Sequence, residues 1–167
     1  NNAYCQDNEI SWVNWQPESA DQALLNFTQR LIEFRRQHPV FRQRKWFQGR
    51  AIHGSDANDI AWFNPDGSEM TRHQWDSDFA KAVSIFLNGE AIATVGSRGE
   101  RILDNSFLLF FNAHCEPLKF AIPAKLQAWD WSVVIDTCAS EFIGLGERHH
   151  QDAEVEARSV LVLQRLG

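Results

Sequence analysis

The chain has 167 residues, 44% of them hydrophobic and 23% charged, a composition ordinary for a globular protein and a length near that of one domain. Its formal net charge of −6 offers no basic surface on which a phosphate backbone would gain from counterion release, so nucleic acid is not expected as a partner. No apolar run is long enough to span a bilayer, and residues 1–6 lack the pattern of a signal peptide. We therefore expect no membrane partner and a cytoplasmic location.

The cysteines and aromatic residues bear on compartment and ligand class. Cys5, Cys115 and Cys138 are odd in number, far apart and without zinc-like spacing, which favours reduced structural thiols and no metal or other cofactor. Seven Trp and twelve Phe accompany a single Tyr. Large aromatics stack on sugars but also dominate the buried area of β-rich domains, so for most of the Trp residues we expect a place in the core.

The first third of the chain predicts a loop followed by a helix. Residues 1–18 are rich in Asn, Asp and Gln and follow no helical or alternating period, so they indicate an irregular loop. Ser19-Ala20-Asp21-Gln22 has the form of a capping box, and Pro39 disfavours helical geometry at the residue before it. A helix is predicted from about residue 20 to 37. Its apolar stripe comprises Leu24, Leu25, Phe27, Leu31, Ile32 and Phe34.

This helix cannot bury its apolar stripe alone, and a β domain after it needs two layers of its own. We expect part of the stripe to pack on something outside the chain. The sequence also lacks an initiator Met and starts in a polar segment, so we expect it to be the C-terminal piece of a longer protein.

After the helix the pattern becomes that of strands. The run 59–64 is closed by Pro65-Asp66-Gly67, whose turn-forming residues predict a hairpin. Further short apolar or β-branched runs predict strands at 82–87, 107–112, 119–122, 131–136 and 156–163. Thr71 can cap a short helix within 70–79, and the stretches 94–104 and 144–154 have the composition of surface loops. Several short strands without intervening helices indicate a sandwich or a barrel.

Few residues are arranged for chemistry. Glycoside hydrolysis usually needs two carboxyl groups at a fixed separation, but the sequence-adjacent acidic pairs are those of a solvated surface. These pairs are Asp56 with Asp59 and Asp76 with Asp78. His149-His150, with Asp152 and Glu154 nearby, is interpreted as a solvated loop rather than a metal site, because adjacent side chains point apart. The segment 2–15 differs, since amides, carboxylates and aromatic rings together are the residue types that bind sugars.

Three motifs resemble a known family. The run from Asn1 to Trp12, followed by Trp15, resembles a segment late in the catalytic barrel of bacterial glycogen debranching enzymes of the isoamylase type, members of the α-amylase family. The segment 31–40 is similar to that family's last barrel helix and its exit. Trp62, the segment 65–71 and Trp75 resemble the opening of its C-terminal β domain.

The resemblance implies a mainly β fold, in which a C-terminal antiparallel β-sandwich follows the last loop and helix of a (β/α)8 barrel. Residues 1–42 would end the catalytic barrel and residues 43–167 would form a supporting domain. The longer enzyme would hydrolyse α-1,6 branch linkages in glycogen or limit dextrin by a retaining mechanism. Its three catalytic carboxyl groups would all precede Asn1, so no residue here is assigned a catalytic role and the isolated chain is expected to be inactive.

Active sites of such barrels lie on the loops after the strands, and residues 1–18 would belong to the last of these loops. Tyr4, Asp7 and Asn8 would then line the sugar cleft, while Trp12 and Trp15 would pack the loop down.

Two other functions fit the sequence. In the first, the chain is a non-catalytic glucan-binding module that docks glycogen through exposed Trp or Phe rings. In the second, it is an oligomerisation unit that self-associates through Leu24, Phe27 and Leu31.

Overall fold

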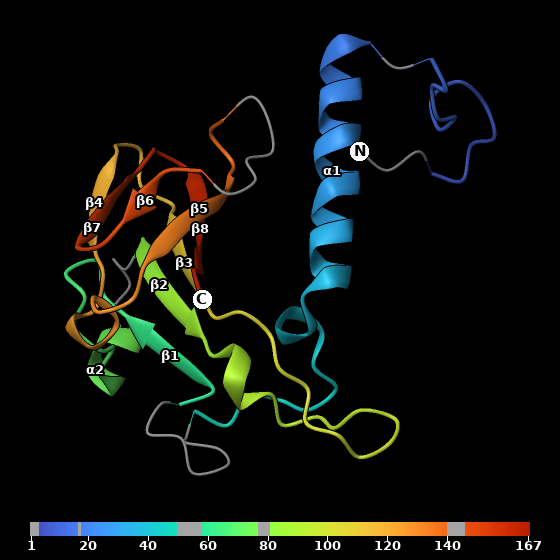
Figure 1. Ribbon diagram of the computed structural model, residues 1–167. Helices are drawn as coiled ribbons and strands as arrows, with labels where there is room; N and C mark the ends of the chain where they lie inside the picture. The colour runs from blue at the N-terminus through green and yellow to red at the C-terminus, as the bar shows by residue number, and fades with distance from the viewer. Residues whose placement is uncertain (1–3, 17, 50–57, 77–80, 140–145) are drawn as a thin grey trace.

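The computed structural model describes residues 4–16, 18–49, 58–76, 81–139 and 146–167. A loop leads into a long helix, which stands beside a domain built of β-strands (Figure 1). The strands all follow the helix in the chain, from Ile60 to Arg165, as predicted.

Helix α1 spans Ser19–Gln37 and confirms the helix predicted over 20–37. The predicted capping box is wrong, because Ser19 is the first helical residue and Glu18 occupies the N-cap without a side-chain hydrogen bond. At the other end His38 leaves helical geometry, and its amide donates to the carbonyl oxygen of Phe34 at 3.1 Å. The 3-10 helix η1 follows at once, over Pro39–Arg42, because Pro at the first position suits a helical start.

The strands form two antiparallel sheets. In the six-stranded sheet the order is β1-β2-β3-β8-β5-β6, and β4 pairs with β7 in a second, two-stranded sheet. The strands are β1 Ile60–Phe63, β2 Ala82–Leu87, β3 Phe107–Asn112, β4 Leu118–Ala121, β5 Trp131–Asp136, β6 Arg148–His149, β7 Asp152–Val155 and β8 Ser159–Arg165. The short helices are α2 Arg72–Trp75, η2 Gly89–Ala91 and η3 Ala124–Leu126.

The predicted mainly β, antiparallel architecture is confirmed, but one predicted loop is wrong. Strands β2, β3 and β5 coincide with the predicted runs, and β8 begins three residues later than expected. The stretch 144–154 was expected to be a surface loop, yet β6 and most of β7 lie in it. Strand β7 reads Asp-Ala-Glu-Val and buries only Ala153 and Val155, so its alternation is short and easily taken for a polar loop.

The main core lies between the two sheets. Fully buried aromatic rings fill it, and Phe110 of β3 meets Phe120 of β4 with ring centroids 5.1 Å apart. The other large members of this core are Phe63, Phe86, Leu108, Ile122, Trp131 and Leu163. This packing of one sheet's inner face on another makes the fold a two-layer sandwich with one small sheet.

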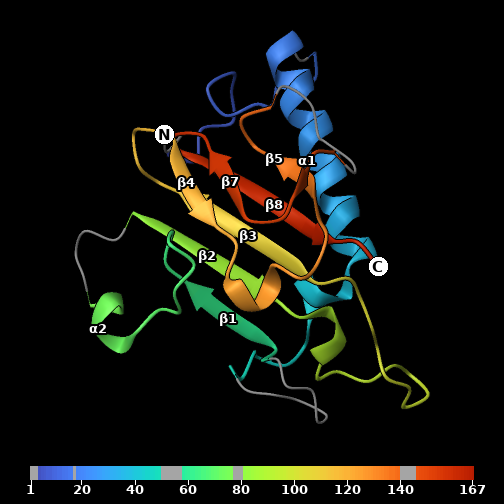
Figure 2. The same cartoon turned by 60° about the vertical axis from the view of Figure 1, so that its left-hand side comes forward.

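Helix α1 stands beside the outer face of the six-stranded sheet, on the side of β8 and β5, and packs on it through Phe27 and Phe34 (Figure 2). Phe34 of α1 and Phe41 of η1 both pack on Phe107 of β3, with ring centroids 5.6 and 4.8 Å apart. Above this contact the helix and sheet leave an apolar cleft of about 430 Å³. Its lining includes Phe27 and Leu31 of the helix and Val160 and Val162 of β8.

The turn after β1 is present as predicted, but the chain that returns from it does not form a full second strand of a hairpin. The amide of Asn64 donates to the carbonyl oxygen of Ser68 at 2.8 Å, but the returning chain pairs with β1 only through one bridge, Phe63 to Glu69. Gly67 adopts a φ of 82°, which favours glycine. Hydrogen bonds from the Ser68 side chain and amide hold the pKa of the Asp66 carboxyl below its ordinary value. The main partner of β1 is β2.

Several residue-level expectations are corrected. Only Trp131 is fully buried, whereas four of the seven Trp residues are exposed, so the expectation that most Trp lie in the core is wrong. The exposed ones are Trp12, Trp15, Trp46 and Trp75. All three cysteines are free and exposed, so they are not buried structural thiols. Asp59, interpreted as part of a solvated acidic surface, is 1% exposed.

Candidate substrate-contacting loop

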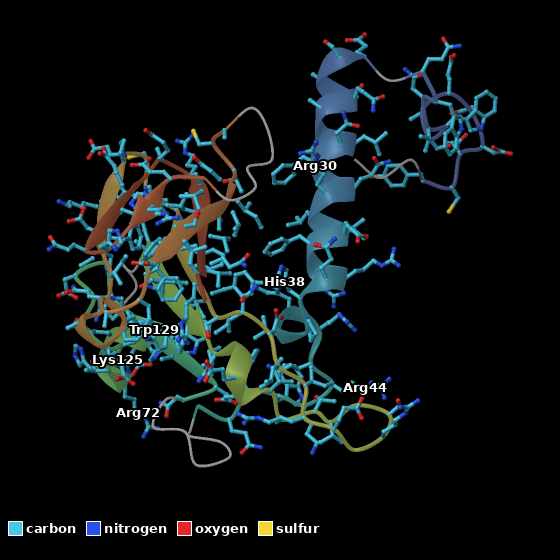
Figure 3. The ribbon with its side chains drawn as sticks, in the orientation of Figure 1. Arg30, His38, Arg44, Arg72, Lys125 and Trp129 are labelled. Carbon is cyan, nitrogen blue, oxygen red and sulfur yellow. The ribbon has the colours of Figure 1, made fainter. Side chains whose placement is uncertain are left out.

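The predicted sugar-contacting residues lie in the loop that precedes α1. This loop leads into the N-terminal end of α1, and its side chains are clear of the strands (Figures 1 and 3). Tyr4, Asp7 and Asn8 are therefore together in one segment.

Asp7 and Asn8 organise the loop through short-range hydrogen bonds. The indole Nε1 of Trp12 donates to Asp7 Oδ1 at 2.7 Å. Asn8 Oδ1 accepts from the amide of Ile10 at 3.1 Å, and the Asn8 carbonyl oxygen accepts from the amides of Ser11 and Trp12 at 2.9 and 3.0 Å. This is the local side-chain-to-backbone bonding through which Asn builds turns. It fixes two of the three candidates without help from a regular element.

Tyr4 enters the loop in an unusual backbone conformation. Its φ is 49° and that of Cys5 is 58°, so two successive non-glycine residues lie in the left-handed region. The Tyr4 side chain is 79% exposed. The chain direction therefore reverses just before Asp7, with the phenol on the surface.

Trp12 and Trp15, expected to pack the loop down in the longer enzyme, are both exposed in this chain, and their packing role stays a prediction. Trp12 ties down Asp7 by its hydrogen bond, but its ring is 64% exposed, and Trp15 is 88% exposed. The loop thus presents aromatic rings together with a carboxylate, an amide and a phenol. Carboxylates and amides hydrogen-bond sugar hydroxyls, while exposed rings offer an apolar face to a pyranose.

Within the described part of the chain, no group of three or more His, Cys, Asp or Glu residues is arranged to hold a metal ion. Nor does any described helix combine the length and apolarity that crossing a membrane requires. What the arrangement can do is position hydroxyl groups.

Two clusters of hydrogen-bonded polar groups were not predicted from the sequence. Asp59, at the entrance to β1, accepts hydrogen bonds from the amides of Gln48, Gly49 and Ile60 at 2.7, 2.8 and 2.9 Å. His38 Nδ1 lies 2.8 Å from Asp104 Oδ1 across 66 positions of sequence. The only signal for Asp59 was a carboxylate directly before an apolar run, and nothing local marked the pair of His38 and Asp104.

Comparison with known proteins places the β domain. Residues 59–164 match the family model of the isoamylase C-terminal domain. The chain belongs to this family. The matched range begins directly before β1 and ends within β8, so it includes every strand of both sheets.

Relatives of the isoamylase C-terminal family extend the match to the loop and α1. A "Glycogen operon protein GlgX homolog" of Mycobacterium tuberculosis is 41% identical over 169 aligned residues, covering 99% of this chain and 23% of its own length. The isoamylase of Pseudomonas amyloderamosa is 26% identical, covering 87% of this chain and 17% of its own. The glycogen debranching enzyme of Dickeya chrysanthemi is 40% identical over 46% of this chain and 10% of its own length.

Among solved structures, the pullulanase from Bacillus acidopullulyticus superposes with a TM-score of 0.50 at 14% sequence identity, covering 87% of this chain and 14% of that one. This likeness concerns the fold alone. The chain spans about a quarter of the length of the first curated relatives it matches. The resemblance to isoamylase-type debranching enzymes is thus confirmed, while the roles of Tyr4, Asp7 and Asn8 stay predictions.

Proposed function

We propose that this chain is the C-terminal part of a glycogen debranching enzyme that hydrolyses α-1,6 branch linkages of glycogen or limit dextrin. The observation that carries the proposal is the match over 99% of this chain, but only 23% of the relative, to a protein named for the glycogen operon. Most of the enzyme, including its catalytic groups, would then precede Asn1. The isolated chain would hydrolyse nothing.

The proposed domain division, 1–42 and 43–167, is supported by two apolar stripes on α1. Phe27 and Phe34 are half-buried against the outer face of the sheet. Leu25 and Ile32 lie about half a turn round the helix and are 44% and 56% exposed. A helix between two units needs two such stripes. The second would pack on the inner parts of a catalytic barrel.

The loop before α1 leads directly into the helix that would end the barrel (Figure 1). A loop in this place would reach the barrel mouth, where barrel enzymes keep their active sites. We assign substrate contacts there to Tyr4, Asp7 and Asn8. Asp7 and Asn8 are held in place by the loop's own hydrogen bonds.

The retaining mechanism belongs to the same proposal. Retaining glycosidases place their two carboxyl groups about 5–5.5 Å apart, one as nucleophile and one as acid and base. A cytoplasmic location is also proposed, and the three free thiols suit a reducing compartment.

The function is tested on the product of the open reading frame that contains this chain. Incubated with glycogen limit dextrin, it should release short linear oligosaccharides, and proton NMR should first detect the α anomer, the configuration of the cleaved bond. A first-formed β anomer would overturn the retaining mechanism. Absence of α-1,6 cleavage by the folded protein would overturn the function.

The loop assignment is tested separately in that longer protein. Tyr4→Ala and Asp7→Asn should each raise KM for limit dextrin by about tenfold, since each removes a hydrogen-bonding or stacking contact of roughly 1.4 kcal/mol. Glu9→Gln, an exposed acidic neighbour in the same loop, is the matched control and should leave KM unchanged. Equal increases in KM for Glu9→Gln and Asp7→Asn would contradict the assignment of Asp7 as a substrate contact.

A further inference from the structure

A pair of tryptophans stands on the edge of the β domain. Trp62 of β1 and Trp75 of α2 have ring centroids 5.1 Å apart, with planes at 79°. Trp75 is 50% exposed and Trp62 is half-buried. Because edge-to-face pairs are mutually stabilising, the two rings are held near a right angle and form a corner with an exposed wall.

Both rings are fixed by backbone structure. Trp62 sits opposite Ile85 in the pairing of β1 with β2, and its carbonyl oxygen accepts from the amide of Met70 at 2.9 Å. Trp75 ends the four-residue helix α2, which is closed at its start by a capping box between Thr71 and Gln74. The corner is therefore pre-organised, and a ligand would bind it without ordering a loop.

The rim of the corner is polar and carries both signs of charge. Arg72, His73 and Asp76 are exposed on or beside α2. A protein–protein interface would be expected to show a wide apolar patch, and the charge of the whole chain, −6, disfavours an anionic ligand. A neutral, polyhydroxylated ligand fits both the rings and the rim, because pyranose faces stack on aromatics and hydroxyls hydrogen-bond charged side chains.

We propose that the Trp62–Trp75 corner is an accessory docking site for linear α-1,4-linked glucan, separate from the site of hydrolysis. The identity of the sugar rests on the proposed function. Two ring planes at a large angle match a chain whose successive glucose units turn relative to one another. Such a site would hold the outer branches of a large polymer while another branch is cleaved.

The corner stays accessible under the proposed domain arrangement. Helix α2 and helix α1 lie at opposite edges of the β domain in both views (Figures 1 and 2). Arg72, which begins α2, lies across the β domain from His38 at the exit of α1 (Figure 3). A barrel packed on α1 would therefore leave Trp62 and Trp75 uncovered.

The direct test is NMR titration of the 167-residue chain with maltoheptaose, which has no branch. The indole signals of Trp62 and Trp75, assigned through Trp→Phe variants, should shift in a saturable way, and those of Trp46 and Trp131 should not. Shifts confined to other indoles, or no saturable shift at millimolar ligand, would overturn the proposal. The titration itself is run on the unmodified chain, and the variants serve only to assign the signals.

A second test of the docking site is affinity electrophoresis in gels that contain glycogen. Trp75→Ala should weaken retardation about tenfold, as expected when a ligand-contacting Trp is truncated, and Trp75→Phe should weaken it less because a ring remains. Trp46→Ala is the matched control, since Trp46 is 92% exposed but outside the corner. Equal losses for Trp46→Ala and Trp75→Ala would contradict a specific site.

The proposed function and the proposed docking site can be disproved independently of each other. Trp75→Ala in the longer protein should leave hydrolysis of a small soluble branched oligosaccharide unchanged and slow hydrolysis of glycogen. If no branched substrate is cleaved by the unmodified protein, the proposed function fails while the maltoheptaose titration still decides the docking site.

Discussion

At the scale of single residues, Asp59 organises the entrance to the sheet. Its buried carboxylate accepts three backbone amides from both sides of the segment that leads into β1. The buried carboxylate is tolerated in the interior because amide dipoles surround it. Asp59 therefore ties Gln48 and Gly49 to the start of β1.

Replacing Asp59 tests this role. Asp59→Asn turns an acceptor oxygen into an N–H donor that faces amide donors, so the free energy of unfolding should fall by about 1–3 kcal/mol in urea denaturation. Asp130→Asn is the control, because the Asp130 carboxylate forms an exposed pair with His150 and the change should alter stability by less than about 0.5 kcal/mol. Equal losses in the two variants would refute the role given to Asp59.

Residue environments were the hardest feature to predict. Trp131 and Trp75 both follow polar residues, yet one is fully buried and the other half-exposed. The difference arises because β5 lies inside the six-stranded sheet, whereas α2 lies beyond its edge strand. Pairing order is a long-range property, so composition alone could not separate a core Trp from a surface Trp.

At the scale of elements, His38 and Asp104 join α1 to the sheet. Asp104 accepts from the amide of Val40 at 3.0 Å through Oδ2 and lies 2.8 Å from His38 through Oδ1, with side-chain exposures of 5% and 14%. The His38 ring also lies 4.8 Å from that of Phe107. These contacts close the exit of the helix onto β3.

Removing the Asp104 carboxylate should release the helix selectively. In Asp104→Ala the Val40 amide and His38 Nδ1 lose their acceptor, so hydrogen exchange of α1 amides should speed up about tenfold or more while exchange in β3 and β8 stays close to the wild-type rate. Glu33→Ala, which removes an exposed pair with Arg36 and an exposed hydrogen bond from Gln37, serves as control. Equal acceleration in helix and sheet would show that α1 is not a separately opening element.

Element prediction succeeded where an apolar run was long. β2, β3 and β5 each have six residues and were predicted at their observed bounds, because interior strands are apolar on both faces. β6 and β7 have only two and four residues, and the sequence of the stretch that holds most of them predicts a surface loop. Their place depends on partners elsewhere in the chain, β5 and β4, so local pattern carried little signal.

At the scale of the whole molecule, α1 is apolar on more of its circumference than the sheet covers. Leu25 and Ile32 remain exposed on the face opposite Phe27 and Phe34. An exposed apolar stripe on a helix marks a contact surface. In the proposed enzyme this surface faces the catalytic barrel, and in the isolated chain the same stripe is free to self-associate.

Polar substitution of that stripe separates these states. Leu25→Gln with Ile32→Gln should leave the isolated chain's stability nearly unchanged and reduce any self-association in sedimentation. In the longer protein the pair should destabilise by about 2 kcal/mol or more, because both side chains would be buried there. Leu103→Gln, at a residue 59% exposed in a surface loop, is the control. A longer protein that tolerates the double variant would contradict the proposed interface.

The resemblance to isoamylase-type enzymes was readable from ordered motifs, and the family match supports it over 59–164. The candidate site was less predictable. The sequence placed Tyr4, Asp7 and Asn8 in one loop, but their hydrogen bonds, and the exposure of Trp15, depend on the turn that Asn8 forms. The proposed substrate contact would further depend on surfaces of the longer protein, which this chain's sequence does not contain.

The most direct test of the central claim compares two proteins on one substrate. Glycogen limit dextrin is incubated with the 167-residue chain and with the full product of its reading frame, and release of linear oligosaccharides is measured. The account predicts release by the longer protein and none by the chain alone. Release by the chain alone, or none by the folded longer protein, would contradict it.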